Sequence, residues 1–255
     1  MNSRQERERD FHNKSFSELT RKDNTEKYYA VARDSRKFYQ DFLKKNCENK
    51  KILEYGCGPG GYSFALAKCN TEVYGIDVSD VAIDKARKTA EKENLKMSFQ
   101  VMDAENLNFA DKTFDIICGI GILHHLDLKR AYSEIARTIK DDGCAIFIEP
   151  IGHNPIINFY RYITPNIRTE DEHPLLMKDL NMAQTYFKRI DIHFYYLTSL
   201  MVVPFRHMKI FNKLLTLFGA IDKVLFTILP FTKRFAWTAV MVLAEPREKA
   251  LLSKS

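Results

Sequence analysis

The sequence lacks the cysteine pattern of a disulfide-bonded or zinc-binding protein. Its five cysteines are scattered along 255 residues, and no two of them form a C-x-x-C pair. We therefore expect neither a disulfide framework nor a zinc site, and we predict no bound metal. Cys57, Cys118 and Cys144 fall in or beside predicted strands, where cysteine packs as a small buried hydrophobic residue. This cysteine usage fits a reducing compartment.

The chain also begins without the apolar stretch of a signal peptide, which favours a cytoplasmic protein. Residues 1–26 are polar, mix both charge signs and show no hydrophobic periodicity, so we predict a partly disordered segment there. Residues 27–255 are predicted to form one domain, with a core large enough to need no disulfide or metal.

A glycine-rich stretch at residues 51–61, with the sequence KILEYGCGPGG, organises the chain. A short predicted strand leads into it and a predicted helix follows it. Between them, Gly56, Gly58 and Gly60 recur at a spacing of two. Glycine allows a sharp turn and lets a ligand lie against the backbone, and the start of a helix offers free N–H groups. The pattern is typical of a cofactor-binding turn.

Two kinds of cofactor would use such a turn. Gly56, Gly58 and Gly61 also satisfy the dinucleotide pattern G-x-G-x-x-G, which is weak by itself. Glu54 lies two residues before the first glycine, where a carboxylate repels a pyrophosphate but suits a cationic group such as an amine. Pro59 also removes one N–H group that a phosphate would use. We therefore favour a cofactor with a cationic end over a dinucleotide.

The second predicted strand, residues 72–77, ends in an acid. The carboxylate of Asp77 can accept hydrogen bonds from both hydroxyls of a ribose. The alternative is that Asp77 caps the next helix. Ser79 and Asp80 are equally good caps for that helix, so we favour the ribose role.

The third and fourth predicted strands lead into two more polar segments. Residues 97–102 are followed by Asp103, for which ordinary turn chemistry is the alternative to ligand binding. The nearly continuous apolar run at residues 114–120 fits a central parallel strand buried on both faces. It opens into a loop that carries His124 and His125.

Strands and helices alternate five times between residues 51 and 150, which predicts a parallel sheet covered by helices. Ligands bind such sheets at the carboxyl ends of the strands. We therefore predict that residues 51–150 form the cofactor-binding core. Six titratable residues are predicted to lie at the strand ends: Glu54, Asp77, Asp103, His124, His125 and Glu149.

The stretch EYGCGPG at residues 54–60 resembles the first motif, E-x-G-x-G-x-G, of the class I S-adenosylmethionine-dependent methyltransferases. The stretch LHHL at residues 123–126 resembles a loop of the small-molecule methyltransferases that include quinone and sterol methylases. The resemblance implies an α/β fold with a doubly wound, mostly parallel seven-stranded sheet, helices on both faces and an antiparallel last strand. It also implies the cofactor S-adenosyl-L-methionine, bound by Glu54, Gly56, Gly58, Gly60, Asp77, Asp103, Ala104 and Ile120.

Two segments outside the core are predicted to contact ligands. In the resembled family a helix before the first strand covers the cofactor, and residues 25–43 show helical periodicity here. Ordinary packing of an amphipathic helix is the alternative. The polar segment at residues 151–188 is predicted to form an acceptor lid. The candidate substrate-binding residues on these segments are Tyr28, Tyr29, His153, Arg161 and Arg168.

Methyl transfer needs an aligned acceptor and, where the acceptor carries a proton, a base. The ordinary pKa of histidine lies near neutrality, so His124 or His125 is a candidate base, and we expect one of them to face the site. The alternative is that neither is catalytic, because proximity and orientation alone lower much of the barrier.

Residues 201–236 form an insertion between the sixth and seventh predicted strands, with six Lys or Arg against one Asp. Lys213, Asp222 and Lys223 interrupt its apolar residues, so it is a poor membrane span. We predict a helical segment, divided at Gly219, with a basic stripe beside a broad apolar face. That face either meets anionic lipid or a hydrophobic acceptor, or packs against the sheet. The predicted face comprises Ile210, Leu214, Leu217, Ile221, Leu225 and Ile228.

The sequence thus predicts methyl transfer from S-adenosyl-L-methionine to oxygen or carbon of a small or lipid-linked acceptor, with peripheral contact to the inner face of a membrane. No Asn/Asp-Pro-Pro-Tyr/Phe run follows the fourth strand, which argues against methylation of adenine or amide nitrogen. Cys118 lies in the middle of a strand and Cys144 begins one, so neither fits the nucleophile of cytosine methylation. The basic residues alternate with aliphatic ones, so nucleic acid is not the expected partner. The alternatives are an NAD-dependent oxidoreductase, an RNA methyltransferase and an inactive membrane-associated scaffold.

Overall fold

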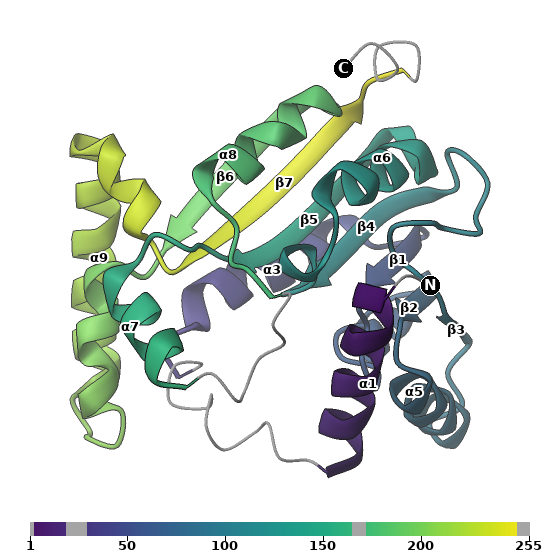
Figure 1. Cartoon of the computed structure of the whole chain (residues 1–255), viewed down its shortest axis with the longest axis horizontal. Coiled ribbons are helices and arrows are strands. Elements are labelled where there is room, and N and C mark those ends of the chain that lie inside the picture. The colour runs from purple at the N-terminus through teal and green to yellow at the C-terminus, as the bar shows by residue number, and fades with distance from the viewer. Residues whose placement is uncertain (1–2, 19–29, 165–171, 249–255) are drawn as a thin grey trace.

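A single seven-stranded sheet forms the centre of the computed structural model, which describes residues 3–18, 30–164 and 172–248 (Figure 1). Its strand order is β3-β2-β1-β4-β5-β7-β6. β1 to β5 are mutually parallel, and β7 runs antiparallel to both β5 and β6. The strands are β1 (Lys51–Tyr55), β2 (Glu72–Asp77), β3 (Met97–Val101), β4 (Phe114–Ile120), β5 (Ile139–Pro150), β6 (Phe187–Tyr195) and β7 (Thr238–Pro246).

Helices cover both faces of the sheet, as the alternation of strands and helices predicts. The main helices are α1 (Ser3–Glu18), α3 (Arg33–Asn46), α4 (Ser63–Ala67), α5 (Asp80–Lys92), α6 (Leu128–Thr138), α7 (Pro155–Ile163), α8 (Met177–Met182) and α9 (Phe211–Ile228). The short 3₁₀ segments are η1 (Leu123–His125), η3 (Ala183–Thr185), η4 (Thr198–Phe205) and η5 (Pro230–Phe235).

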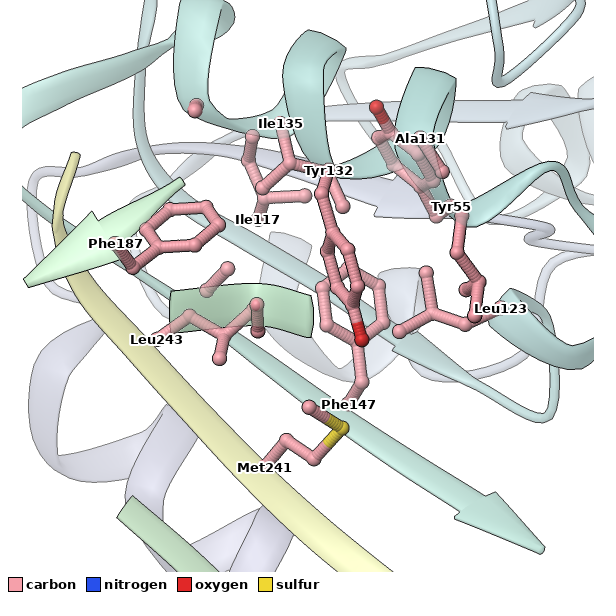
Figure 2. Close-up of a cluster of buried hydrophobic side chains, with 14 of the residues drawn as sticks. Tyr55, Ile117, Leu123, Ala131, Tyr132, Ile135, Phe147, Phe187, Met241 and Leu243 are labelled. Atoms are coloured by element: carbon pink, nitrogen blue, oxygen red, sulfur yellow. The ribbon is translucent and has the colours of Figure 1, made fainter. Parts of the chain in front are cut away.

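Successive residues of the central strands point to opposite faces and join different cores. Ile117 of β4 packs beneath Tyr132 and Ile135 of α6, in the cluster that Figure 2 shows. Its neighbour Ile116 joins Tyr39 of α3 on the other face. Because both faces of β4 are apolar and covered, the predicted buried central strand and the doubly wound architecture are confirmed.

The N-terminal segment differs from the sequence expectation. We predicted partial disorder over residues 1–26, but Ser3–Glu18 form the helix α1, which packs beside α5 (Figure 1). Polar contacts hold it there: Asn13 Nδ2 donates to Asp80, and Ser79 Oγ donates to Asn13 Oδ1. The hydrophobic pattern could not reveal a helix that is anchored by hydrogen bonds.

The insertion between β6 and β7 also differs from the prediction in two ways. α9 runs unbroken through Gly219, so the predicted division is wrong. Its buried face is defined by Leu215, Asp222 and Phe226, whereas Leu217 and Ile228 of the predicted apolar face are exposed. None of the helices in the described ranges is long and apolar enough to cross a membrane.

Asp222 explains why α9 turns this face inward. Its carboxylate, only 3% exposed, accepts hydrogen bonds from the main-chain N–H groups of Leu197, Thr198 and Ser199. The hydroxyls of Thr198 and Ser199 donate to the same carboxylate, each at 2.6 Å. A buried carboxylate with five donors replaces its lost hydration, so it fixes the rotation of α9 against η4.

Glu54 closes the glycine turn at the end of β1. Its two carboxylate oxygens accept hydrogen bonds from the N–H groups of Tyr62, at 3.2 Å, and Ser63, at 2.9 Å, at the start of α4. Burial of the side chain raises the pKa of this carboxyl from 4.5 to about 7, although the two N–H donors oppose the shift.

We predict that Asp222→Ala lowers the free energy of unfolding by about 2–4 kcal/mol, because five donors lose a charged acceptor. Urea denaturation measures this change. Replacement of the exposed neighbour Lys223 by alanine is the matched control and should change stability by less than about 0.5 kcal/mol. Equal effects of the two substitutions would refute the anchoring role of Asp222.

The raised pKa of Glu54 predicts a pH-dependent stability. Between pH 4.5 and about 7 the folded protein retains a proton that the unfolded chain has released, so raising the pH lowers the unfolding free energy. In Glu54→Gln this component, on the order of 2–3 kcal/mol, should be absent. Denaturation of both proteins from pH 5 to 8, with the exposed Glu91→Gln as control, measures the difference in slope. Parallel wild-type and Glu54→Gln profiles would contradict the prediction.

Candidate cofactor and acceptor site

A cavity of about 200 Å³ lies at the carboxyl ends of β1, β2 and β4. This is the edge at which open parallel sheets bind their ligands. Its walls come from the glycine turn, the ends of β2 and β4, the segment that follows β3, and one side of α1. The residues that line it are Arg4, Gln5, Glu8, His12, Phe16, Gly56, Gly58, Ile76, Asp77, Val78, Met102, Asp103, Ala104, Glu105, Ile120, Gly121, Ile122, His125 and Leu126.

The glycine turn brings bare backbone to the cavity wall. Gly56 and Gly58 have φ values of 60° and 53°. Residues other than glycine rarely adopt positive φ values. A Cβ on Gly56 would also lie 2.8 Å from a side-chain carbon of Ile122. The turn therefore requires glycine, and it leaves room for a ligand beside the backbone.

Asp77 lies at the end of β2 and lines the cavity. Its carboxylate accepts hydrogen bonds from the N–H groups of Gly58 and Ser79, each at 2.9 Å. The helix cap is instead the Ser79 side chain, which accepts from Ala82 N, so the capping alternative for Asp77 does not apply. Burial raises the pKa of Asp77, while the two N–H donors and the nearby His12 and His125 lower it.

Asp103, Ala104 and Ile120 also line the cavity. Asp103 Oδ1 accepts a hydrogen bond from the N–H of Glu105, which is the expected turn chemistry. Its other oxygen accepts from Gln5 Nε2 of α1 at 2.7 Å. The carboxylate therefore faces the cavity as well as shaping the turn.

Glu54 and Gly60 are not among the side chains and backbone that line the cavity. Glu54 holds the turn from behind through Tyr62 and Ser63. At Gly60, with φ 93°, a Cβ would lie 2.0 Å from the ring of Phe64. The contacts of these two residues shape the turn, and a direct role in binding stays a prediction for both.

The two histidines occupy different positions. His125 lines the cavity, whereas His124 lies beside it, and the centroids of their rings are 4.2 Å apart. His124 Nδ1 is 2.7 Å from a carboxylate oxygen of Glu149 at the end of β5. The other oxygen of Glu149 accepts from the N–H groups of Ile122 and Leu123. Glu149 therefore fixes the loop and the imidazole together.

The pKa of His124 is lowered because burial disfavours the charged imidazolium and because His125 is close, although Glu149 opposes the shift. Burial therefore favours the neutral form of the His124 imidazole. Gly121 lines the cavity, and a Cβ at this glycine would lie 3.5 Å from Cε1 of His124. The imidazole thus lies directly behind a glycine in the cavity wall.

Of the predicted substrate-binding residues that the structure describes, only Arg161 is connected to the histidines, through Glu172. Arg161 Nη1 donates to Glu172 at 2.8 Å, and one oxygen of Glu172 lies within 4.8 Å of ring nitrogens of both His124 and His125. His153 instead accepts from the N–H of Met177, at 3.4 Å. Tyr28, Tyr29 and Arg168 lie outside the described residues.

Sequence reasoning missed the residues that α1 contributes. Arg4 forms an ion pair with Glu105, and its Nη1 also donates to the carbonyl oxygen of His125 at 2.6 Å. Glu8 and His12 follow it on the side of α1 that lines the cavity. Glu8 and His12 are four residues apart, a spacing that places two side chains on the same side of a helix. This spacing was the sequence signal from which their shared position could have been predicted.

Comparison with known proteins agrees with this arrangement. The family described as "Methyltransferase domain" matches residues 52–143. The ubiquinone biosynthesis O-methyltransferase of Coxiella burnetii is 37% identical over 108 residues, covering 42% of this chain and 46% of that protein. The sterol 24-C-methyltransferase of Aspergillus fumigatus is 34% identical over 120 residues, covering 46% of this chain and 31% of that protein. The chain thus spans less than half the length of these two relatives.

The fold is shared with solved methyltransferases beyond the matched segment. A phosphoethanolamine N-methyltransferase of Haemonchus contortus, solved with S-adenosylhomocysteine, superposes with a TM-score of 0.61 at 16% identity, over 83% of this chain and 53% of that chain. The predicted fold class is therefore confirmed. The match to the methyltransferase family covers residues 52–143, and the solved structure shows that the fold is shared over most of the chain.

Proposed function

We propose that the chain transfers a methyl group from S-adenosyl-L-methionine to oxygen or carbon of a small or lipid-linked acceptor. One observation carries this proposal: the cavity beside the glycine turn also adjoins a histidine that a buried carboxylate orients. The two relatives are named for an O-methylation in ubiquinone biosynthesis and a C-methylation of a sterol, which supports oxygen or carbon as the acceptor atom.

The cavity has the groups that the cofactor requires. The backbone at Gly56 and Gly58 would lie along it, Asp77 would accept from the ribose hydroxyls, and Asp103 with Ala104 would border the adenine. When bound, S-adenosyl-L-methionine supplies an activated sulfonium methyl group. The protein then has to orient the acceptor, exclude water and remove a proton.

His124 is the proposed base. Glu149 at Nδ1 holds the imidazole in the tautomer whose Nε2 is free to accept a proton, and its negative charge compensates the imidazolium that forms. The pair resembles the buried carboxylate and histidine of other proton-transfer sites in its physical logic. We assign His125, which lines the cavity, to acceptor contact rather than to proton removal.

The segment at residues 151–188 is the proposed acceptor lid. Arg161 on α7 is paired with Glu172, and Glu172 reaches the two histidines. Burial raises the pKa of Glu172, but the nearby imidazoles of His124 and His125 and the guanidinium of Arg161 outweigh this effect, so the pKa of Glu172 is lowered. The ionised carboxylate of Glu172 lies between Arg161 of the proposed lid and the two histidines. A movement of the lid would therefore change the surroundings of the proposed base, His124.

The outer surface of α7 and α9 supports a membrane location. Ile157 of α7 and Leu215 of α9 share one buried cluster, so the two helices present adjoining outer faces (Figure 1). Large hydrophobic side chains are exposed on both, including Phe159 at 65% and Ile228 at 70%. We define the proposed lipid-facing surface by the exposed hydrophobic residues of α7 and of residues 201–231, which are Ile156, Phe159, Tyr162, Ile163, Met201, Phe205, Met208, Ile210, Leu217, Ile221, Val224, Ile228, Leu229 and Phe231.

Basic side chains border this lipid-facing surface. Lys209, Lys213 and Lys223 are exposed on the same insertion, and its single acid, Asp222, is buried against η4. An apolar surface with a basic border fits the interface of an anionic bilayer. We therefore propose peripheral binding at the cytoplasmic face of a membrane, where a hydrophobic acceptor would be available.

We predict that His124→Ala and Glu149→Gln each lower kcat by about 10²–10⁴-fold while cofactor affinity changes little, since neither side chain lines the cofactor cavity. His125→Ala should lower kcat far less. The assay measures transfer of a tritiated methyl group to lipids extracted with solvent from the cells in which the protein is expressed. Calorimetry measures cofactor affinity.

Asp77→Ala is the matched control for that assay, because it should weaken cofactor binding by about 1–3 kcal/mol. Wild-type turnover in both His124→Ala and Glu149→Gln would exclude the proposed base. If no host extract accepts methyl groups from the wild-type protein although the cofactor binds, the proposed transfer itself is wrong.

The membrane proposal predicts sedimentation with anionic vesicles at low salt and release at high salt. Replacing Lys209, Lys213 and Lys223 with glutamate should abolish binding, since each lysine contributes about 1 kcal/mol of attraction. The matched control is the same triple change at three exposed lysines on or just after α5: Lys88, Lys92 and Lys96. Protein that stays in the supernatant at low salt would refute the proposal.

A further inference from the structure

Three side chains of types that commonly coordinate metals meet at one wall of the cavity. Glu8 and His12 come from successive turns of α1, and His125 comes from η1. One ligand atom from each residue lies within 4.8 Å of the other two. Glu8 Oε2 is 3.4 Å from His12 Nε2 and 3.2 Å from His125 Nδ1.

These separations match the spacing of ligands around a metal ion. Zinc binds imidazole nitrogen and carboxylate oxygen at about 2.0–2.2 Å, so two ligands at a tetrahedral angle lie roughly 3.3–3.6 Å apart. Octahedral neighbours at the same bond lengths lie about 3.0 Å apart. The two distances from Glu8 Oε2 fall across this range, so an ion could enter with small side-chain adjustments.

The hydrogen bonding of His125 points to a missing ligand. Its side chain is only 7% exposed, and its Nδ1 has no hydrogen-bond partner among the residues that the structure describes. Glu8 Oε2 is near enough for an ion pair, but this contact does not have the geometry of a hydrogen bond. A buried ring nitrogen without a donor or acceptor costs free energy, which metal coordination would recover.

The two elements that carry these side chains are fixed to each other. Arg4 of α1 donates to the main-chain oxygen of His125, so it joins the helix directly to η1. Asn13, one residue after His12, is held by Asp80 and Ser79. Ligands on anchored elements lose little conformational entropy when an ion binds.

We infer that Glu8, His12 and His125 form a binding site for a divalent first-row transition-metal ion. Two imidazoles and one carboxylate suit zinc, manganese or iron(II) better than magnesium or calcium, which prefer oxygen ligands. All three residues line the cavity, so the remaining coordination positions face it. An oxygen atom of the acceptor would fit there. This inference revises the sequence expectation of no metal.

The competing explanation is an ion pair between Glu8 and a protonated histidine, without metal. It requires no ion and predicts no change on chelation. The two explanations therefore differ in metal binding itself, which can be measured without cofactor or acceptor. This separation keeps the test independent of the proposed methyl transfer.

The experiment uses the full chain after treatment with a chelator. Cobalt(II) serves as a spectroscopic probe and zinc as a calorimetric one. We expect one equivalent of each to bind, cobalt to develop the visible bands of a low-coordinate nitrogen and oxygen site, and bound zinc to raise the melting temperature. Glu8→Gln, His12→Gln and His125→Gln should each weaken binding by at least about tenfold.

Two matched variants control for surface binding. Glu6→Gln removes an exposed acid from the same helix, and His193→Gln removes a histidine that is paired with Asp191 on β6. Both should bind the metals as the wild type does. Circular dichroism confirms that each variant is folded. If cobalt gives no ligand-field bands, or if the three ligand variants bind zinc as tightly as the two controls, the site does not exist.

Discussion

Buried or half-buried carboxylates at the strand ends, each satisfied by main-chain N–H groups, hold the carboxyl edge of the sheet together. Glu54 accepts from the start of α4, and Asp77 accepts from Gly58 in the glycine turn. Asp103 accepts within its own turn, and Glu149 accepts from the loop after β4. Burying a carboxylate is costly unless donors replace its hydration, so each acid fixes the loop that supplies those donors.

This constraint explains how much of the site was predictable. Strand alternation placed Asp77, Asp103 and the histidines at one edge, because the carboxyl ends of parallel strands coincide. What the sequence could not supply was the direction of each side chain. Glu54 turns toward the start of α4 and not into the cavity, a choice that depends on where the N–H groups of Tyr62 and Ser63 lie in space.

The two elements that departed from prediction share one cause. Hydrophobic periodicity locates elements that pack through apolar faces, whereas α1 is held by Gln5 and Asn13, and the buried face of α9 contains Asp222. A prediction that assigns every polar residue to the solvent misses α1 and assigns the wrong face of α9 to the interior. In both cases a polar side chain is buried because long-range partners satisfy it.

The two adjacent histidines have different surroundings because they contact different carboxylates. His124 is bound to Glu149 on the sheet, while His125 meets Glu8 on α1. His124 is therefore tied to the sheet, and His125 lies at the boundary between the sheet and the N-terminal helix.

α1 consequently links the proposed metal site to the cofactor cavity. Gln5 holds Asp103 on one side of the helix, and Glu8 and His12, one and two turns later, lie next to His125. A ligand that binds Glu8, His12 and His125 together would hold α1 over the cavity, and a ligand that displaced α1 would separate those three residues. Binding at the two places is then thermodynamically coupled, and the coupling is the same in both directions.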